Sequence, residues 1–92
     1  MIRNFRHKGL KRLFEKDDRR RVPAQSAERI KRLLDALEAA RIVRDLHLPG
    51  FGLHELKGDR TGTWAISVSG NWRITFTFND GEARNVDLED YH

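Results

Sequence analysis

Residues 64–80 read WAISVSGNWRITFTFND, and this stretch decides the fold. Large apolar side chains occupy every second position on both sides of a Gly-Asn turn: Trp64, Ile66, Val68, Trp72, Ile74, Phe76 and Phe78. Period-two alternation rich in aromatic and β-branched residues predicts strands with one buried face. The opposite face of these strands carries one cation, Arg73, among small hydroxyl residues.

Turn signals on either side of this stretch extend the sheet. Asn79-Asp80-Gly81 is a strong hairpin signal that returns the chain as a strand over residues 83–88. Residues 53–57 form a candidate strand, followed by a loop rich in turn formers at residues 58–62. Residues 2–5 could add a short strand. We therefore expect an antiparallel sheet of three or four strands.

Two helices are predicted before the sheet. Leu10, Leu13 and Phe14 recur at the spacing of an amphipathic helix over residues 7–15, and residues 16–22 are polar enough to form a loop. Pro23 suits the start of a second helix, whose apolar stripe comprises Ala27, Ile30, Leu33, Leu34, Leu37 and Ala40 or Arg41. Helices followed by strands predict an α+β fold in one domain, residues 1–92.

Charge is unevenly distributed along the chain. The formal net charge is +4 and the sequence pI is about 10.0, with nine of the lysines and arginines in the first 21 residues: Arg3, Arg6, Lys8, Lys11, Arg12, Lys16, Arg19, Arg20 and Arg21. A basic region of this kind suits a polyanion such as nucleic acid or the ribosome, or an acidic protein partner. A solvated helix surface is the alternative.

Several classes of site are excluded by residue type and spacing. The chain has no cysteine, its four histidines lack metal-ligand spacing, and no Walker-type phosphate loop or serine-triad motif is present. We expect no metal and no cofactor. No apolar run is long enough for a membrane span or a signal peptide, so the expected location is the cytoplasm.

The remaining polar residues suit cleavage of RNA without a metal. In that reaction the ribose 2′-OH attacks the neighbouring phosphate, which requires a base, an acid for the leaving 5′-oxygen and a cation for the phosphorane charge. Histidine serves as base or acid near neutral pH, and arginine or lysine binds phosphate. Candidates lie at His54, Lys57, Arg73 and the terminal Asp90-Tyr91-His92.

Each candidate also has a structural interpretation. His54 could be a partly buried histidine bound to a backbone carbonyl, and Arg73 could pair with Asp87 or Glu89. The cations at positions 57 and 60 could be ordinary loop charges, Asp90 could pair with an arginine, and the last two residues could be a frayed terminus.

Three segments together are similar to one toxin family. They are Pro49-Gly50-Phe51 with Leu53 to Arg60, then Trp64 to Phe76 with its Asn71-Trp72-Arg73, and the closing Asp90-Tyr91-His92. These residues closely resemble the HigB-type toxins, the host-inhibition proteins within the RelE/ParE superfamily of type II toxin–antitoxin systems. The opening residues 2–10 fit as well, so the resemblance covers essentially the whole chain.

The resemblance implies two N-terminal helices on a small curved antiparallel sheet, and a ribosome-dependent endoribonuclease that cuts mRNA in the A site. It implies His54 and His92 as the acid–base pair, without deciding which is the base, and Asp90 as the residue that orients its neighbours. Tyr91 would hold or polarise the scissile nucleotide. The phosphate-binding residues would be Lys57, Arg73 and Arg60.

The resemblance also implies partners. The expected partner is a helix-turn-helix antitoxin of the HigA type, and operator DNA would be contacted only through the toxin–antitoxin complex. The basic first helix and the loop Arg19-Arg20-Arg21 would contact ribosomal RNA or the antitoxin. Two alternatives remain: a ParE-like gyrase poison that needs no catalytic residues, and a non-enzymatic RNA- or protein-binding module.

Overall fold

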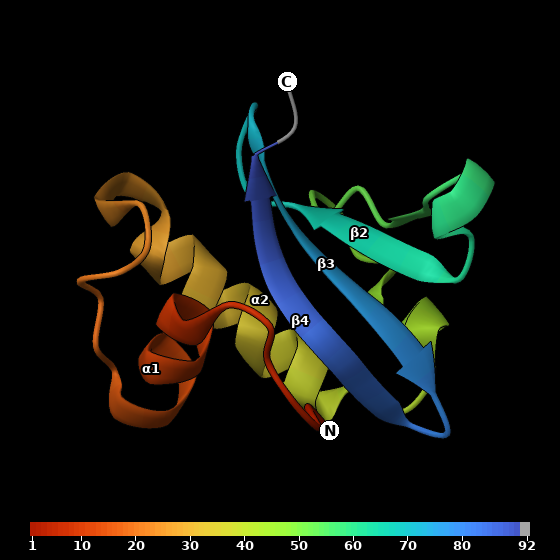
Figure 1. Ribbon diagram of the computed structural model, residues 1–92, viewed down its shortest axis with the longest axis horizontal. Helices are drawn as coiled ribbons and strands as arrows, with labels where there is room; N and C mark the ends of the chain where they lie inside the picture. The colour runs from red at the N-terminus through yellow and green to blue at the C-terminus, as the bar shows by residue number, and fades with distance from the viewer. Residues whose placement is uncertain (91–92) are drawn as a thin grey trace.

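The computed structural model describes residues 1–90, which form two helices and one four-stranded antiparallel sheet (Figure 1). Helix α1 spans Lys8–Lys16 and helix α2 spans Ala27–Ala39. The strands lie in the order β1 (His54–Glu55), β2 (Thr63–Ser67), β3 (Trp72–Asn79) and β4 (Glu82–Asp90). Three short 3₁₀ turns complete the fold: η1 (Ala24–Ser26), η2 (Val43–Leu46) and η3 (Gly58–Arg60). The predicted α+β class is confirmed.

The first helix and the last strand differ from the prediction by one or two residues at their ends, and larger differences occur at β1, at residues 2–5 and before α2. Strand β1 is only two residues long, because the chain turns into η3 soon after Glu55. Residues 2–5 make two isolated parallel bridges to β4, Ile2 to Ala83 and Phe5 to Val86, instead of a regular strand. The second helix is preceded by the 3₁₀ turn η1 after Pro23.

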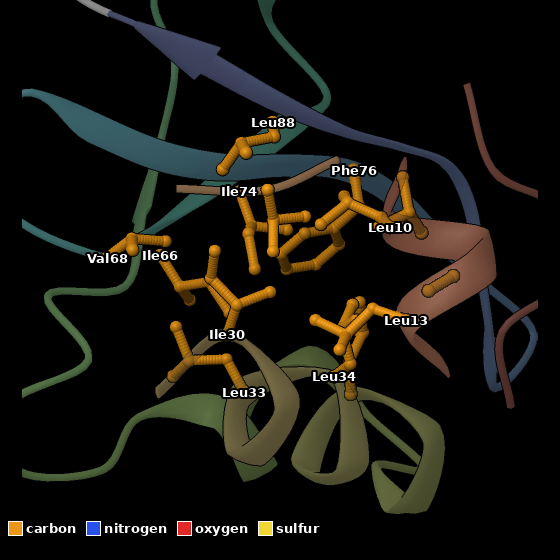
Figure 2. Packing of buried hydrophobic residues seen from close by; sticks show 14 of the residues in the cluster. Leu10, Leu13, Ile30, Leu33, Leu34, Ile66, Val68, Ile74, Phe76 and Leu88 are labelled. Atoms are coloured by element: carbon orange, nitrogen blue, oxygen red, sulfur yellow. The ribbon is translucent and has the colours of Figure 1, made fainter. Parts of the chain in front are cut away.

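Both helices cover the same face of the sheet and close the core against it (Figure 2). The predicted stripes face the core, with Leu10 and Leu13 of α1 and Ile30 and Leu34 of α2 fully inaccessible, whereas Phe14 is only partly buried. The sheet contributes Ile66, Ile74, Phe76, Val86 and Leu88. Burying each such side chain contributes about 1.5–3 kcal/mol, so this core fixes which face of every strand points inward.

The β3–β4 hairpin contains a tight turn and a bulge. Asp80 and Gly81 both have positive φ, 53° and 77°, as a two-residue type I′ turn requires. The register then shifts by one residue between Thr75 and Thr77, next to Asn85 with φ 56°. A bulge of this kind inserts one extra residue into β4 and changes which residues of the strand lie opposite β3.

Arg29 of α2 joins the helix layer to the sheet edge. Its guanidinium donates hydrogen bonds to the carbonyl oxygens of Val68 at 2.9 Å, Gly50 at 2.7 Å and Ser67 at 2.9 Å. One side chain thus satisfies two backbone acceptors at the end of β2 and one in the turn before β1. Within residues 1–90, no helix has the length and apolar character needed to cross a membrane.

Candidate active site

The face of the sheet opposite the helices carries the predicted strand cation. On β3, Arg73 and Thr75 alternate with the buried Ile74, so they project away from the core. Arg73 lies directly opposite Glu89 on β4 and Ser67 on β2. Because directly opposed residues share a face, the acidic side chain of Glu89 lies beside the guanidinium of Arg73.

A second row of residues brings His54 to the same face. Thr75 lies opposite Ala65 on β2, and Ala65 lies opposite His54 on β1. Neighbouring strands are about 4.8 Å apart, so His54 stands roughly 10 Å from Thr75 across the sheet. The structure therefore places the predicted histidine and the predicted strand cation on one surface.

Four polar side chains on this face form what we call the Glu89 cluster: Arg60, Arg73, Thr75 and Glu89. Arg60 donates two hydrogen bonds to the two carboxylate oxygens, at 2.8 and 2.6 Å. Arg73 Nη2 lies 3.4 Å from Glu89 Oε1, and the hydroxyl of Thr75 donates to Glu89 Oε2 at 2.6 Å. One carboxylate thus contacts two cations and a hydroxyl that come from three different segments.

The cluster is largely withdrawn from solvent. The side chains of Arg73 and Glu89 are 17% and 20% exposed, and Thr75 is buried. Hydrogen bonds from Arg60, and then from Thr75 and Arg73, lower the pKa of Glu89 to about 2, although burial acts in the opposite direction. The same ion pair raises the pKa of Arg60. Glu89 is therefore ionised at neutral pH, and it offsets one of the two positive charges.

His54 is held by its own loop and faces solvent. Its Nδ1 lies 2.9 Å from the carbonyl oxygen of Gly52. A carbonyl oxygen can only accept, so Nδ1 carries the proton and Nε2 of the neutral ring presents a lone pair. The predicted backbone-bonded histidine is thus observed, but the residue is exposed and not partly buried. Because Nδ1 binds the backbone carbonyl and Nε2 faces solvent, the structural interpretation and the catalytic interpretation of His54 do not exclude each other.

Lys57 and Arg60 lie in one short loop between β1 and β2. Lys57 is the exposed residue that immediately precedes η3, and Arg60 is the last residue of this turn. The ion pair from Arg60 to Glu89 fixes the loop to the sheet. Both terminal nitrogens of Arg60 are therefore held by the Glu89 carboxylate, whereas Lys57 is exposed in the loop.

Asp90 ends β4 and lies opposite Trp72 of β3. Because side chains alternate along a strand, this register places Asp90 on the side of the sheet that carries Trp72, away from Glu89 and Arg73. Tyr91 and His92 lie outside the described residues. The predicted catalytic roles of Asp90, Tyr91 and His92 stay predictions.

A polar hollow of about 490 Å³ lies beside the same end of the sheet. Its lining includes Gln25 and Ser26 after α1, and Ser69, Asn71 and Trp72 from the β2–β3 hairpin. An indole ring with amide and hydroxyl groups around it can stack on a nucleobase and bind its edges. Among residues 1–90, no three histidine, aspartate or glutamate side chains are grouped so that they could hold a metal ion.

Glu89 is the residue that sequence reasoning did not place in the site. It entered only as one of two possible ion-pair partners of Arg73. Counting back from the Asp80-Gly81 turn puts Arg73 opposite Leu88, and only the bulge near Asn85 moves Glu89 into that position. Glu89 follows the apolar Leu88 in a strand whose side chains alternate between faces. This alternation was the sequence signal that could have placed Glu89 on the polar face.

Comparison with known proteins identifies the family. Residues 3–92 match the family described as the RelE-like toxin of the type II toxin–antitoxin system HigB. The chain is 50% identical to Endoribonuclease HigB of Proteus vulgaris over 92 residues, which is the full length of both chains. It is 33% identical to Toxin HigB-1 of Vibrio cholerae serotype O1 over 91 residues, covering 97% of this chain and 96% of that protein.

Solved structures show the same fold at low identity. A mutant of YafQ from E. coli superposes with a TM-score of 0.62 at 20% identity, covering 98% of this chain and 91% of that one. A second structure of E. coli YafQ gives a TM-score of 0.57 at 16% identity with the same coverage. The predicted fold and the predicted family are both confirmed. The chain belongs to the HigB-like family of RelE-like toxins of type II toxin–antitoxin systems.

Proposed function

We propose that this HigB-type endoribonuclease toxin cuts mRNA in the ribosomal A site and so inhibits translation. The observation that carries the proposal is the polar face of the sheet. There, His54 and Arg73 lie on one surface, two strands apart, with Arg60 beside Arg73. A base and a cation held on a rigid sheet provide much of what 2′-OH attack on a phosphodiester requires.

The proposed reaction begins at His54. Its Nε2 takes the proton of the ribose 2′-OH, because Nδ1 already donates to Gly52. The 2′-oxygen then bonds to phosphorus, the bond from phosphorus to the 5′-oxygen breaks, and a cyclic 2′,3′-phosphate remains. His92 gives a proton to the leaving 5′-oxygen. Asp90 orients its neighbours, and Tyr91 holds the scissile nucleotide.

The phosphate would be held by Arg73 and Lys57. Arg73 presents a planar guanidinium on the polar face, 3.4 Å from Glu89, and this group matches the geometry of phosphate oxygens. Lys57 is exposed in the loop that Arg60 anchors. A cation that meets the growing phosphorane charge contributes roughly 100- to 1000-fold in rate.

Dependence on the ribosome is supported by the position of the basic residues. The solvent-facing side of α1 carries Lys8, Lys11, Arg12 and Lys16. Arg19 pairs with Glu28, and both Arg20 of the loop and Arg12 of α1 pair with Asp18, so these three arginines are partly neutralised, and the lysines of α1 carry the argument. The face of α1 is thus better suited than the loop to contact the phosphates of ribosomal RNA.

A type II system implies an antitoxin partner. We infer that this partner is a helix-turn-helix protein of the HigA type, and that operator DNA is contacted only through the complex. An adjacent reading frame encoding such a protein would support this assignment.

Cleavage of ribosome-bound mRNA by the purified protein tests the proposal. We expect cuts inside A-site codons and poor cleavage of the same RNA free in solution, since the ribosome supplies the orientation. His92→Ala and a chain lacking the last three residues should remain folded and make no cuts. Induced expression should halt translation in cells.

Other outcomes would favour different functions. Double-strand DNA breaks with intact mRNA would indicate a gyrase poison. Full toxicity of His92→Ala would indicate a binding module without acid–base chemistry. Equal cleavage rates on free and ribosome-bound RNA would show that cleavage does not depend on the ribosome.

A further inference from the structure

We propose that Glu89 is a positioning residue for RNA cleavage, which fixes Arg73 and the loop of Lys57 in one arrangement. This inference rests on the proposed function of the polar face. It assigns a role to an acidic side chain in a site that must bind a polyanion, where a carboxylate would otherwise weaken binding.

The contacts of Glu89 reach one proposed phosphate ligand, Arg73, and the loop that carries the other, Lys57. Through Arg60 it anchors η3, the turn that follows Lys57. Through its 3.4 Å contact it lies against Arg73 on the neighbouring strand. It also immediately precedes Asp90, the first residue of the proposed catalytic tail.

Charge explains why a carboxylate is needed at this position. Two guanidinium groups that share a partly buried site repel each other, and each would otherwise turn toward solvent. The Glu89 carboxylate attracts both, and the Thr75 hydroxyl fixes its second oxygen at 2.6 Å. The arrangement exists before RNA binds, so the substrate phosphate would meet cations that are already oriented.

The same contacts argue against two other roles. The pKa of Glu89 is held near 2 by Arg60, Thr75 and Arg73, so the group carries no exchangeable proton near neutral pH. Both terminal nitrogens of Arg60 bind Glu89, which makes Arg60 the partner of the carboxylate and leaves phosphate binding to Arg73 and Lys57. Glu89 therefore acts through Arg73 and the loop, not on the RNA itself.

The first experiment is Glu89→Gln, assayed by single-turnover cleavage of ribosome-bound mRNA. Loss of orientation should lower kcat roughly 10- to 100-fold. KM should be unchanged or lower, because the variant gains one unit of positive charge toward RNA. The shape of the rate–pH profile should not change, since Glu89 does not titrate in the assayed range.

A matched control lies on the same strand. Glu82 also accepts a hydrogen bond from an arginine, Arg84, but at the far end of β4. Glu82→Gln makes the same chemical change and should leave kcat within about twofold of the parent. A loss as large as that of Glu89→Gln would show that any break in a β4 ion pair lowers the rate, and would overturn the proposal.

A double-mutant comparison separates positioning from general structural damage. Glu89→Gln should cost less activity when Arg73 is already alanine than it costs in the parent, because one of the two groups through which it acts is gone. Full additivity of the two losses would contradict the proposal, as would a Glu89→Gln variant that cleaves as fast as the parent. A lower KM with unchanged kcat would show that Glu89 only competes with RNA.

Thr75→Val provides a second route if Glu89→Gln does not fold. Valine keeps the shape of the buried threonine and removes only the hydroxyl that binds Glu89. We expect kcat to fall severalfold with KM unchanged, and an unchanged kcat would overturn the proposal. If the parent protein itself does not cut ribosome-bound mRNA, the proposed function fails, which is distinct from failure of the Glu89 role.

Discussion

The guanidinium of Arg60 and the carboxylate of Glu89 form a two-point ion pair, with nitrogen–oxygen distances of 2.8 and 2.6 Å, across 29 residues of sequence. This pair joins the loop between β1 and β2 to the last strand, which are not neighbours in the sheet. It lies on the face that the helices leave uncovered. The geometry of the proposed site therefore depends on a tertiary contact as much as on the strands.

Glu89 should make stability depend on pH. Its pKa is lowered to about 2 from an ordinary value near 4.5, so the unfolded chain binds its proton first as the pH falls. The stabilisation should be complete above about pH 4.5 and be lost as the pH falls toward 2. Denaturant unfolding of the parent and Glu89→Gln at several pH values measures it. We expect a difference of about 1–2 kcal/mol at pH 7. The two proteins should converge at low pH, and a constant gap would contradict the assignment.

His54→Ala should remove cleavage without unfolding the protein. The ring is exposed, so the substitution creates no cavity, and loss of a general base costs roughly 100- to 10,000-fold in rate. His47 provides a control, since it is also exposed but lies outside the polar face, after η2. Single-turnover rates and circular dichroism of both variants check the result. Similar losses for the two would show that His54 has no special role.

Arg73→Lys should keep the charge and lose most of the rate. Lysine presents a compact ammonium in place of the planar guanidinium, so it cannot contact Glu89 and a phosphate in the same fixed geometry. We expect a fall in kcat of about 10-fold or more. Measured kcat and KM for Arg73→Lys and Arg84→Lys distinguish this from a general effect of arginine loss. A fully active Arg73→Lys would mean that charge alone suffices.

Arg29→Met should destabilise the fold while leaving the polar face intact. Its three hydrogen bonds to Val68, Gly50 and Ser67 satisfy carbonyl groups at the end of β2 and in the turn before β1, and methionine keeps only the alkyl packing. Hydrogen bonds from a charged group contribute about 1.5–3 kcal/mol, so we expect a loss of about 2 kcal/mol. Urea unfolding measures this loss. Arg32→Met, on the exposed side of the same helix, should change stability by less than about 0.5 kcal/mol.

Gly9→Ala should destabilise the protein although alanine favours helices. In an exposed helix the change would stabilise by about 1 kcal/mol. At Gly9, however, the new Cβ would lie 2.5 Å from the Arg21 carbonyl oxygen and 2.8 Å from the Arg21 Cβ, so the loop after α1 must move. Gly70→Ala is the control, because it meets open space. A Tm for Gly9→Ala at or above that of the parent would refute the packing argument.

Local sequence patterns were sufficient for most of the fold. The spacing of Leu10, Leu13 and Ile30 predicted both helices and their buried faces, and the Asp80-Gly81 turn predicted the β3–β4 hairpin. These features are decided within a few residues, by side-chain periodicity and by the φ values that a turn demands. His54 and Arg73 could be singled out for the same reason, because each residue type suits one chemical role.

The sequence by itself determined the elements, the buried faces and the residue types available for cleavage of RNA. Only the tertiary structure decided which of those residues meet. One extra residue near Asn85 shifts the register and brings Glu89, in place of Leu88, opposite Arg73. The fold of the β1–β2 loop then brings Arg60 onto the same carboxylate. Neither contact follows from local spacing, since a side chain's partner across a sheet depends on the summed register and on the path of a distant loop.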